Sequence, residues 1–534
     1  MIGAPLPRRA GLQRLAGSAR FDLVVIGGGA TGTGVALDAA ARGLDVALFE
    51  AGDFAQGTSS RATKLAHGGV RYLAQGDIGL VREALRERGA MLANAPHVAQ
   101  RLAFVVPGYH WWEPGWFGAG LKAYDLLAGT RSLGRTEWLS AADTRRRLPT
   151  VATEGLTGGV RYWDGQFDDA RLALLIARTA AARGALVLNH CPVVALVREQ
   201  GRVGGVVVRD TIGGTEHRVE ARCVVNATGV WVDALRALDH DDGATPAPAP
   251  LLAPSQGVHL VVDRAFLPGN DALMVPRTRD GRVMFAVPWL GKTVLGTTDT
   301  PRREVEREPA PQPEEIEFIL VEAGRYLARA PTRADVRSVW VGMRPLVRPG
   351  GGAAGDSKAI SREHLVVTSA SGLVTVTGGK WTTYRSMAED VLERCMAQGL
   401  LPRRQGGVTE RLPLLGAAAG RPLCEPPGEH LYGSEGATLR ALPGADRWLW
   451  RDAESGQGGL SEAMVRFAAR HEMAQTVEDV LARRCRLLFL DAAEAERQAE
   501  PVAAILAEEL GAGFDAARSC ETLVALAQRY RRLP

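Results

Sequence analysis

Residues 21–34 read FDLVVIGGGATGTG: a run of strand length, a glycine-rich turn and the start of a helical segment. In that context the spacing of Gly27, Gly29 and Gly32 predicts a dinucleotide-binding unit. Gly27 permits a tight turn, Gly29 lets the backbone approach a pyrophosphate, and Gly32 allows the helix to pack closely on the strand. The helix N-terminus can then hold the phosphate groups. The stretch therefore favours an α/β fold with a Rossmann-like nucleotide domain.

A second predicted strand, residues 45–49, ends in Glu50. A carboxylate at this place meets the ribose hydroxyls of an adenosine, so Glu50 favours FAD or NAD over NADP, whose ribose carries a phosphate. The glycine pattern alone is weak, because residues 350–355 (GGGAAG) match it too. Those glycines follow prolines and precede no helical pattern, so we expect a loop there.

The segment TSSRATKLAHGGVRYL, residues 58–73, gathers hydroxyls, cations and paired glycines into one short stretch. That combination predicts a phosphate-handling flavin site. We interpret His67 as a positioning residue rather than a base, and Lys64 either lies near the flavin or simply solvates the loop. The residues of this segment expected to bind the cofactor are Thr58, Ser59, Ser60, Lys64, Leu65, His67, Gly68 and Gly69.

Further along, the chain returns to nucleotide-domain patterns. Asp168 and Asp169 can cap a helix expected over residues 170–183. Residues 224–229 (VVNATG) then indicate a buried strand ending in a small-residue turn. The cofactor contacts expected at this turn are Ala227, Thr228 and Gly229.

A last glycine signal lies in residues 377–384 (TGGKWTTY). Gly378 and Gly379 permit close approach to an isoalloxazine ring. A helix is expected over residues 382–394, and its N-terminus would stabilise the anion of a reduced flavin. Both glycines are therefore expected to bind the cofactor.

Composition disfavours several other classes of protein. The formal net charge of +4 argues against a nucleic-acid binder. The six cysteines are widely spaced without a CxxC pair, so no iron–sulfur cluster, disulfide framework or other metal site is expected, and a reducing compartment fits. No run of about 18 apolar residues occurs, so no membrane span is predicted. Residues 1–20 have no apolar core and are expected to form a flexible arm rather than an export signal.

Proline and glycine mark the expected domain boundaries. The Pro/Ala-rich stretch 241–254 indicates a crossing between domains, and a connection near residue 402 precedes a helical domain expected over residues 405–534. A flavin-dependent oxidoreductase region is expected over residues 21–400. Its FAD-binding segments are expected at about 21–95, 160–250 and 345–400, and its substrate-domain segments at about 96–159 and 251–344.

Several sequence blocks occur in an order that resembles the FAD-dependent, quinone-linked glycerol-3-phosphate dehydrogenases. They include DLVVIGGGATGTG, TSSRATKLAHGGVRYL, VVNATGVWVD, GMRPL and VTGGKWTTYRSMAED, and the tail is similar to the C-terminal helical domain of that family. The resemblance implies a glutathione-reductase-type FAD domain built from discontinuous segments, a β-rich substrate domain and a helical C-terminal domain. It also implies noncovalent FAD, oxidation of sn-glycerol 3-phosphate to dihydroxyacetone phosphate, and transfer of electrons to a membrane quinone. The long insertion of the related oxidases is absent from this sequence, which favours a dehydrogenase.

The expected reaction needs a hydride acceptor, a base for the hydroxyl proton and cations for the phosphate. Guanidinium groups match phosphate oxygens with paired hydrogen bonds, so arginines are candidates for a phosphate clamp. An imidazole titrates near neutral pH, and His259 matches a histidine near the flavin in the family, so it is the leading general base. The resemblance places substrate-binding residues at Arg71, Tyr72, Arg344, Arg362, Lys380 and Thr383, with His259, Arg344 and Lys380 taking part in catalysis.

Two other functions stay open on the sequence. An amine or amino-acid oxidase on the same fold would need a carboxylate clamp, whereas several cations favour a phosphate. A flavin-bearing RNA-binding or RNA-modifying protein would use the arginine-rich tail, but residues 470–486 interleave their cations with acidic residues, as on a solvated helix face. We therefore expect no nucleic-acid partner, and a homodimer is one option for the oligomeric state.

Aromatic residues gather at residues 109–117 (YHWWEPGWF), and residues 121–127 follow with helical spacing. Aromatics of this kind anchor proteins at a bilayer interface, where an amphipathic helix with a cationic side can lie in the membrane plane. Alternatively, the rings simply pack in the core. The first interpretation predicts a cytoplasmic protein attached peripherally to the cytoplasmic face of the membrane.

Overall fold

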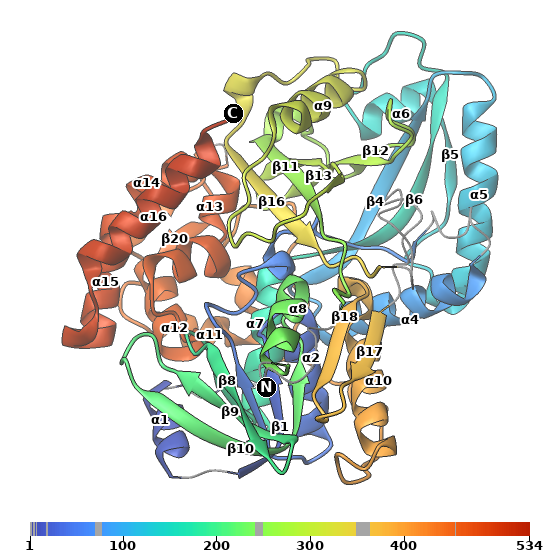
Figure 1. Ribbon diagram of the computed structural model, residues 1–534. Coiled ribbons are helices and arrows are strands. Elements are labelled where there is room, and N and C mark those ends of the chain that lie inside the picture. The colour runs from blue at the N-terminus through green and yellow to red at the C-terminus, as the bar shows by residue number, and fades with distance from the viewer. Residues whose placement is uncertain are drawn as a thin grey trace.

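The computed structural model describes residues 3, 6, 8–17, 20–69, 77–240, 249–348, 364–453 and 455–534. Within these residues the strands form two large sheets and one short hairpin, and helices from the C-terminal part of the chain lie beside both sheets (Figure 1). This arrangement confirms the predicted α/β class, with a Rossmann-like nucleotide domain and a C-terminal helical domain.

The first sheet, here called the nucleotide sheet, has a parallel core in which β1 lies between β2 and β10, and β18 lies beyond β10. Apolar side chains are buried along β1 because helices or strands cover both of its faces, as is usual for a parallel sheet. Its strands are β1 (Arg20–Ile26), β2 (Val46–Phe49), β7 (Leu186–Leu188), β8 (Val193–Glu199), β9 (Arg202–Arg209), β10 (Glu216–Asn226), β17 (His364–Thr368) and β18 (Val374–Gly378).

Three helices pack side by side on the nucleotide sheet. Helix α2 (Ala30–Ala41) lies between α7 (Asp169–Ala182) and α10 (Tyr384–Ala397). The predicted cap of α7 is confirmed, since Asp168 Oδ1 accepts a hydrogen bond from the Arg171 amide at 3.3 Å. The three helices come from distant parts of the sequence, so the nucleotide domain is assembled only by tertiary folding.

The second sheet, here called the substrate sheet, is mostly antiparallel. Its order is β15-β11-β14-β13-β12-β4-β6-β3, with β16 paired to β11 and β5 paired to β6. The strands are β3 (Leu65–Ala66), β4 (Ala99–Gly108), β5 (Glu137–Ser140), β6 (Gly158–Phe167), β11 (Ser255–Asp263), β12 (Ala272–Val275), β13 (Met284–Trp289), β14 (Lys292–Gly296), β15 (Thr300–Pro301) and β16 (Ser338–Arg344). Strands β3 and most of β6 thus belong to this sheet, although the sequence placed their residues in FAD-binding segments. The helices around it are α4 (Ile78–Asn94), α5 (Glu113–Ala128), α6 (Ala141–Arg147) and α9 (Pro313–Gly324), while α8 (Val232–Leu238) follows β10 of the nucleotide sheet.

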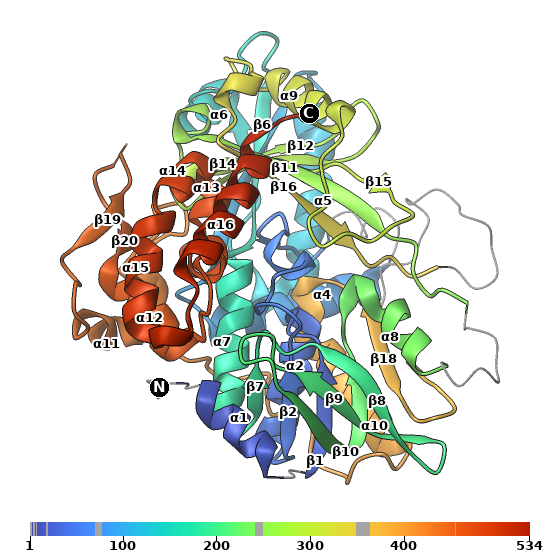
Figure 2. The ribbon, with the colours of Figure 1, turned by 60° about the vertical axis from the view of Figure 1, so that its left-hand side comes forward.

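The C-terminal helices lie beside the substrate sheet and beside helix α7, which packs on the nucleotide sheet (Figure 2). They share an apolar core with the substrate sheet, in which Phe489 packs on Trp340 with ring centroids 5.1 Å apart. The elements are α11 (Gly436–Arg440), the hairpin β19 (Trp448–Arg451) and β20 (Gly459–Ser461), α12 (Glu462–Glu472), a π-helical segment Asp479–Arg484, α13 (Leu487–Leu490), α14 (Ala492–Arg497), α15 (Ala499–Leu510) and α16 (Ala516–Arg531). In the described part of the chain, no helix is both long and apolar enough to span a bilayer.

The N-terminal residues differ from the expected flexible arm. Residues Arg8–Ala16 form helix α1, which packs against β7 and β10. Arg8 is buried, and its guanidinium donates to Asp210 Oδ1 at 2.7 Å and to the Asn189 carbonyl at 3.1 Å. A charge-assisted contact of this kind fixes the start of the helix to the nucleotide domain.

Candidate active site

The glycine-rich turn after β1 packs closely against its own helix and against the end of β10. Helix α2 begins after Gly29, which provides no side-chain cap, so the first amides of the helix face the turn. A Cβ on Gly32 would lie 1.9 Å from the Gly27 carbonyl oxygen, and one on Gly27, where φ is +109°, would lie 2.6 Å from the Ala227 carbonyl oxygen. Side chains are therefore excluded at both positions, as the tight turn and the close helix packing of a dinucleotide-binding unit require.

Glu50 lies at the carboxyl end of β2, beside this turn. Its Oε2 accepts from the Gly28 amide at 2.6 Å, and its Oε1 accepts from the Gly52 amide at 2.9 Å. Burial raises the pKa of Glu50 above its usual value, although both amides act in the opposite direction. The two amides hold the carboxylate in place next to the glycine-rich turn, where it fits the predicted ribose contact.

The segment from Thr58 to Lys64, here called loop 58–64, links the two sheets. Ser59 Oγ accepts from the Ala30 amide at the start of α2 at 2.9 Å. The Ser59 carbonyl accepts from Trp381 Nε1, also at 2.9 Å, and Thr58 Oγ1 donates to the Met343 carbonyl at 2.6 Å. The loop thus contacts the start of helix α2 and the residues next to Arg344 and Lys380, which are Met343 and Trp381.

Lys64, at the end of this loop, lies inside the protein. Its side chain is fully buried, and Nζ donates to the Ser60 carbonyl and to Asp169 Oδ2, each at 2.7 Å. Burial, opposed by the charge of Asp169, lowers the pKa of Lys64 to about 7. The alternative that Lys64 merely solvates the loop is therefore wrong.

The residues after the loop lead into the substrate sheet. Leu65 in β3 pairs with Gln166, and the Gly68 amide donates to the Tyr124 hydroxyl at 2.9 Å. Gly69 has a φ of +80°, which favours glycine. The predicted substrate residues Arg71, Tyr72 and Arg362, and the glycine pattern at residues 350–355, lie outside the described residues.

The two other glycine signals meet at neighbouring strand ends. The turn Ala227-Thr228-Gly229 follows β10, Gly378 ends β18, and these strands are adjacent and parallel. The Ala227 amide donates to the Ile26 carbonyl of β1 at 2.9 Å. Gly379 has a φ of +71°, and a Cβ there would lie 2.4 Å from Met387 Sδ. These glycines therefore gather at the carboxyl ends of the strands, where ligands of such sheets bind.

His259 lies in β11 of the substrate sheet and is 2% exposed. Its Nε2 is 2.9 Å from Thr63 Oγ1, and its ring stacks on Trp340 with centroids 5.3 Å apart. The Nδ1 atom has no hydrogen-bond partner among the described residues. Burial, together with the charges of Lys64 and Arg344, holds the pKa of His259 well below its usual value. The expected titration near neutral pH is therefore wrong, because the imidazole is already neutral there.

Arg344 ends β16, next to β11, and its guanidinium is fixed by nearby oxygens. Nη1 lies 3.0 Å from Asp299 Oδ1, and Nη2 donates to the Thr298 carbonyl at 3.0 Å. The side chain keeps about a quarter of its surface exposed. Guanidinium groups match the oxygens of an anion with paired hydrogen bonds, so Arg344 stays a candidate for the phosphate clamp.

Lys380 and Thr383 lie at the start of α10, directly after the paired glycines. Thr383 Oγ1 donates to the Lys380 carbonyl at 3.2 Å, which fixes the turn before the helix. Loop 58–64 therefore brings together the predicted sites: it contacts His259 through Thr63, the strand of Arg344 through Thr58, and the turn of Lys380 through Ser59.

Three arginines of the C-terminal domain lie inside the protein, although the sequence predicted a solvated helix face there. Arg483, Arg484 and Arg486 are all buried, so that assignment is wrong for them, although Arg470 is partly exposed and pairs with Glu509. The apolar run LLFL that follows at residues 487–490 was the available signal, because it indicates a buried segment.

Residues 22–385 match the family described as FAD dependent oxidoreductase, and residues 407–518 match the C-terminal domain of alpha-glycerophosphate oxidase. The chain is 41% identical over 528 residues to the mitochondrial glycerol-3-phosphate dehydrogenase of Arabidopsis thaliana, covering 92% of this chain and 83% of that protein. It is 40% identical over 540 residues to the mitochondrial enzyme of Homo sapiens, covering 95% of this chain and 73% of that protein. The chain belongs to the FAD-dependent glycerol-3-phosphate dehydrogenases. The resemblance, the class of enzyme and the FAD cofactor predicted from the sequence are thereby confirmed.

A crystal structure agrees with the assignment of the chain to this family. The glycerol-3-phosphate dehydrogenase of Bacillus halodurans, solved as a complex with FAD, superposes with a TM-score of 0.77 at 31% identity and covers 98% of both chains. The L-proline dehydrogenase of P. horikoshii reaches a TM-score of 0.52 at 16% identity, which shows a shared fold alone.

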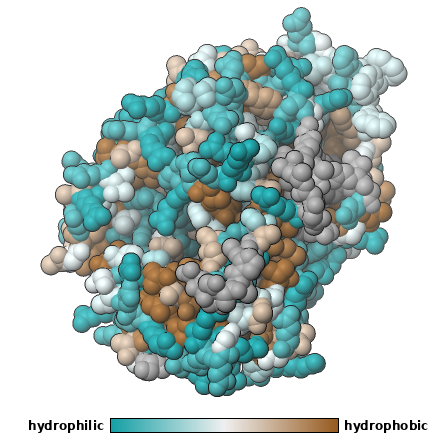
Figure 3. All heavy atoms as spheres, viewed as in Figure 1, coloured by the Kyte–Doolittle hydropathy of each residue, from teal (hydrophilic) through white to brown (hydrophobic). Residues whose placement is uncertain are grey.

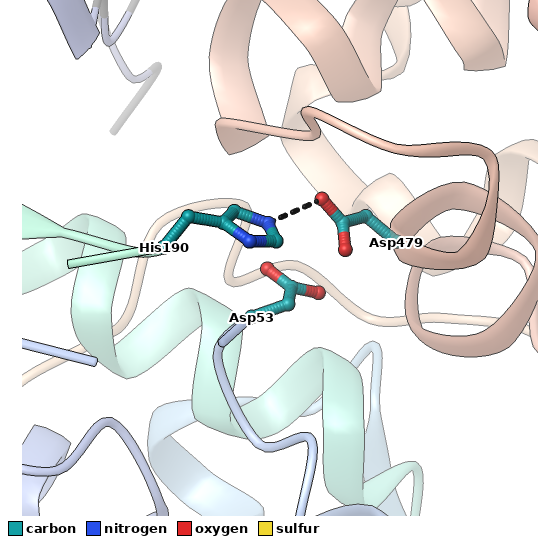
Figure 4. Close-up of side chains that lie close together, drawn as sticks. All are labelled: Asp53, His190 and Asp479. Carbon is teal, nitrogen blue, oxygen red and sulfur yellow. Dashed lines mark hydrogen bonds and ion pairs between the residues drawn. The ribbon is translucent and has the colours of Figure 1, made fainter. Parts of the chain in front are cut away.

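In this dehydrogenase, Asp53, His190 and Asp479 lie close enough for their ligand atoms to surround an ion (Figure 4). His190 Nε2 is 3.0 Å from Asp479 Oδ2. However, Arg483 Nη2 lies 2.8 Å from Asp479 Oδ1, and Arg484 Nη2 donates to Asp53 Oδ1 at 2.9 Å. Two guanidinium groups thus balance the carboxylates. We assign these five residues, here called the Asp53 network, to the attachment of the C-terminal domain to the nucleotide sheet.

Proposed function

We propose that this dehydrogenase oxidises the C2 hydroxyl of sn-glycerol 3-phosphate to the ketone of dihydroxyacetone phosphate and passes the electrons to a membrane quinone. When bound, FAD supplies the acceptor for the hydride. The observation that carries the proposal is loop 58–64, which contacts the start of α2, His259, the strand of Arg344 and the turn after Lys380.

The proposed FAD site consists of groups that suit its parts. The start of α2, where Gly29 carries no side chain, suits the pyrophosphate, Glu50 suits the ribose, and the positive-φ glycines Gly378 and Gly379 suit the flat ring system. The residues proposed to hold FAD are Gly27, Gly29, Gly32, Glu50, Thr58, Ser59, Ser60, Lys64, Leu65, His67, Gly68, Gly69, Ala227, Thr228, Gly229, Gly378 and Gly379.

His259 is proposed to accept the hydroxyl proton at Nδ1. That atom is buried without a hydrogen-bond partner among the described residues, and the lowered pKa keeps the imidazole neutral, so it can act as an acceptor. Thr63 and Trp340 fix the ring from its other sides.

Arg344 and Lys380 are proposed to bind the phosphate, with Thr383 adding a hydrogen bond. A phosphate carries about −1.5 to −2 charges, so it favours a site with several cations over the single clamp that a carboxylate needs. The family resemblance adds Arg71, Tyr72 and Arg362 to this set. Because several cations favour a phosphate over a carboxylate, an amino-acid oxidase is disfavoured.

Attachment to a membrane surface is proposed through helix α5 and its flanking aromatics. The exposed fractions are 87% for Trp111, 50% for Trp112, 72% for Trp116, 76% for Leu126 and 54% for Trp138. The alternative that the rings of residues 109–117 pack in the core is therefore wrong for Trp111, Trp112 and Trp116, although Phe117 packs against the apolar core. Hydrophobic side chains are visible at the edge where Figure 1 places α5 (Figure 3).

The exposed face of α5 suits the interface of a bilayer. Besides Trp116 and Leu126 it carries small residues such as Ala119 and Ala123, and Lys122 is its cation. Tryptophan rings prefer the headgroup level, and a lysine next to them can reach anionic lipids. An exposed apolar surface of this kind beside the substrate sheet supports quinone access from the membrane.

The reaction is tested with purified holoenzyme under anaerobic conditions. We expect glycerol 3-phosphate to bleach the visible absorbance of the flavin and to yield one dihydroxyacetone phosphate per flavin, whereas glycine and D-amino acids leave the flavin oxidised. A soluble quinone should then restore the absorbance faster than dissolved oxygen does. Bleaching by an amino acid, or none by glycerol 3-phosphate, would contradict the proposal.

A further inference from the structure

At the end of loop 58–64 lies a group of charged side chains to which the proposed reaction assigns no chemical step. Lys64, Asp168, Asp169 and Arg486, here called the Lys64 cluster, are all fully buried. Lys64 ends the loop, the two aspartates start α7, and Arg486 comes from the C-terminal domain just before α13. The cluster balances two cations with two carboxylates at a place where three parts of the molecule meet.

The contacts of Arg486 lead directly to the loop. Its Nη2 donates to the Ser60 carbonyl at 2.7 Å and lies 3.1 Å from Asp169 Oδ1. The other oxygen of Asp169 accepts from Lys64 Nζ at 2.7 Å and from the Ala62 amide at 3.0 Å. Because Lys64 Nζ also donates to the Ser60 carbonyl, two cations hold this one peptide group of the loop.

Arg486 is itself fixed by the C-terminal domain. Its Nη1 donates to the Ala482 carbonyl at 3.0 Å, and its guanidinium carbon lies 4.2 Å from the centre of the Phe489 ring. The residue has a φ of +67° and lies between the π-helical segment Asp479–Arg484 and α13. The side chain therefore reaches the loop from a rigid base.

The next residues of the loop bear the groups assigned to the active site. Ser59 contacts the start of α2 and Trp381, and Thr63 contacts His259. Ser60 and Ala62, the residues that the Lys64 cluster holds, lie between them in sequence. Ser59 and Thr63 belong to the same short loop as Ser60. A shift of the Ser60 peptide would therefore displace both, since consecutive planar peptides transmit displacement along a short loop.

Because the Lys64 cluster is buried, we expect it to control the geometry of loop 58–64. Charges without solvent must be satisfied by partners at fixed positions, and the loss of one partner leaves another buried charge uncompensated. A buried ionic group contributes little net stability compared with apolar packing, but it allows few alternative arrangements.

We propose that Arg486 is a positioning residue through which the C-terminal helical domain fixes loop 58–64 in the geometry that holds FAD and orients His259. The inference rests on the proposed placement of FAD against residues 58–60. It makes the helical domain part of the flavin site, although none of its described residues is assigned to the reaction itself.

The test measures how fast FAD leaves the holoenzyme. Arg486→Met removes the charge together with the contacts to the Ser60 carbonyl and to Asp169, and Arg486→Lys retains a charge that can reach one of them. We expect Arg486→Met to speed FAD release, followed by the fluorescence of free flavin after dilution, by about tenfold or more, and Arg486→Lys to have a smaller effect. The bound-flavin absorbance spectrum should lose fine structure in the same order, because the ring environment becomes less uniform.

Two matched variants separate positioning from stability. Arg178→Met breaks a buried pair with Glu435 across the same domain interface but away from the loop. Arg466→Met breaks pairs with Glu508 and Glu509 inside the C-terminal domain. Both should lower the thermal midpoint while FAD release stays within about twofold of the unchanged protein.

The outcomes distinguish the inference from the proposed site. If Arg486→Met releases FAD no faster than Arg178→Met, the positioning role is refuted. If Glu50→Gln also leaves FAD release unchanged, the placement of FAD is wrong as well. If Arg486→Met does not fold, Arg486→Lys takes its place. The positioning role is then refuted if Arg486→Lys releases FAD no faster than Arg178→Met.

Discussion

At the scale of single residues, Glu50 gives the most direct test of where FAD lies. Glu50→Gln keeps the side-chain shape and one carbonyl acceptor but removes the charge that the ribose hydroxyls would contact. A hydrogen bond to a charged group contributes about 1.5–3 kcal/mol, so the dissociation constant of FAD should rise by about ten- to a hundredfold. Titration of the apoprotein with FAD, followed by fluorescence quenching, measures this. Asp45→Asn, at an exposed ion pair near β2, is the control, and equal affinities for both variants would remove Glu50 from the site.

Arg344 tests the phosphate clamp. Arg344→Lys keeps the charge, so Asp299 retains a cationic partner, but the fork that binds two phosphate oxygens is lost. We expect kcat/KM for glycerol 3-phosphate to fall by about ten- to a hundredfold, while flavin content and FAD release stay unchanged. Steady-state kinetics with a soluble dye as acceptor provide the measurement. Unaltered kinetics would exclude Arg344 from substrate binding.

His259 tests the proposed base and its pH dependence. A general base contributes about a hundred- to ten-thousandfold, so His259→Ala should slow anaerobic flavin reduction by that order. Because burial and nearby cations hold the pKa of His259 well below 6.5, the unchanged enzyme should lose rate only as the pH falls below that value. The variant should lack this acid limb in stopped-flow measurements. The control is His217→Ala, which should keep the acid limb of the pH–rate profile. If the acid limb persists in His259→Ala, another residue is the base.

At the scale of elements, helix α5 tests membrane attachment. Replacement of Trp111, Trp116 and Leu126 by serine removes exposed apolar surface without touching the buried side of the helix. We expect binding to vesicles that contain anionic lipids to weaken by about tenfold or more, since each ring carries large apolar area. Co-sedimentation measures the binding, and activity with a soluble dye should be retained. Ile212→Ser, an exposed apolar residue on the β9–β10 turn, is the control, and undiminished binding of the triple variant would exclude α5 as the anchor.

At the scale of the whole molecule, the Asp53 network should make stability depend on pH. The carboxylates of Asp479 and Asp53 outweigh burial and raise the pKa of His190 above 6.5. The stabilisation from protonated His190 is therefore complete below pH 6.5 and is lost as the pH rises through the higher, folded-state pKa.

The variant His190→Asn measures this contribution. Its loss of unfolding free energy, from urea midpoints of the holoenzyme, should be largest near pH 6 and should shrink towards pH 9. His217→Asn, on a strand of the nucleotide sheet outside the network, is the control. A difference between His190→Asn and the unchanged protein that grows with pH would contradict the assigned ion pair.

The sequence by itself determined the nucleotide fold, the cofactor and the family. These features rest on patterns that are local in the chain: a strand, a turn with glycines at Gly27, Gly29 and Gly32, and a helix. Gly32 is required by a contact within the same turn, with the Gly27 carbonyl oxygen, and Gly27 by its positive φ and by the Ala227 carbonyl at the end of the adjacent strand β10. The same holds for the helix cap at Asp168, which acts within one turn.

Only the tertiary structure decided the environment of the candidate site. The Arg486 guanidinium and the Ser60 carbonyl are 426 positions apart in sequence, and no local pattern predicts that they meet. The lowered pKa of His259 depends on burial and on Lys64 and Arg344, which come from different segments. Whether the tryptophans near α5 are core or surface likewise depended on packing. Burial and long-range charge are properties of the assembled molecule, since both arise from groups that the chain brings together only when it folds.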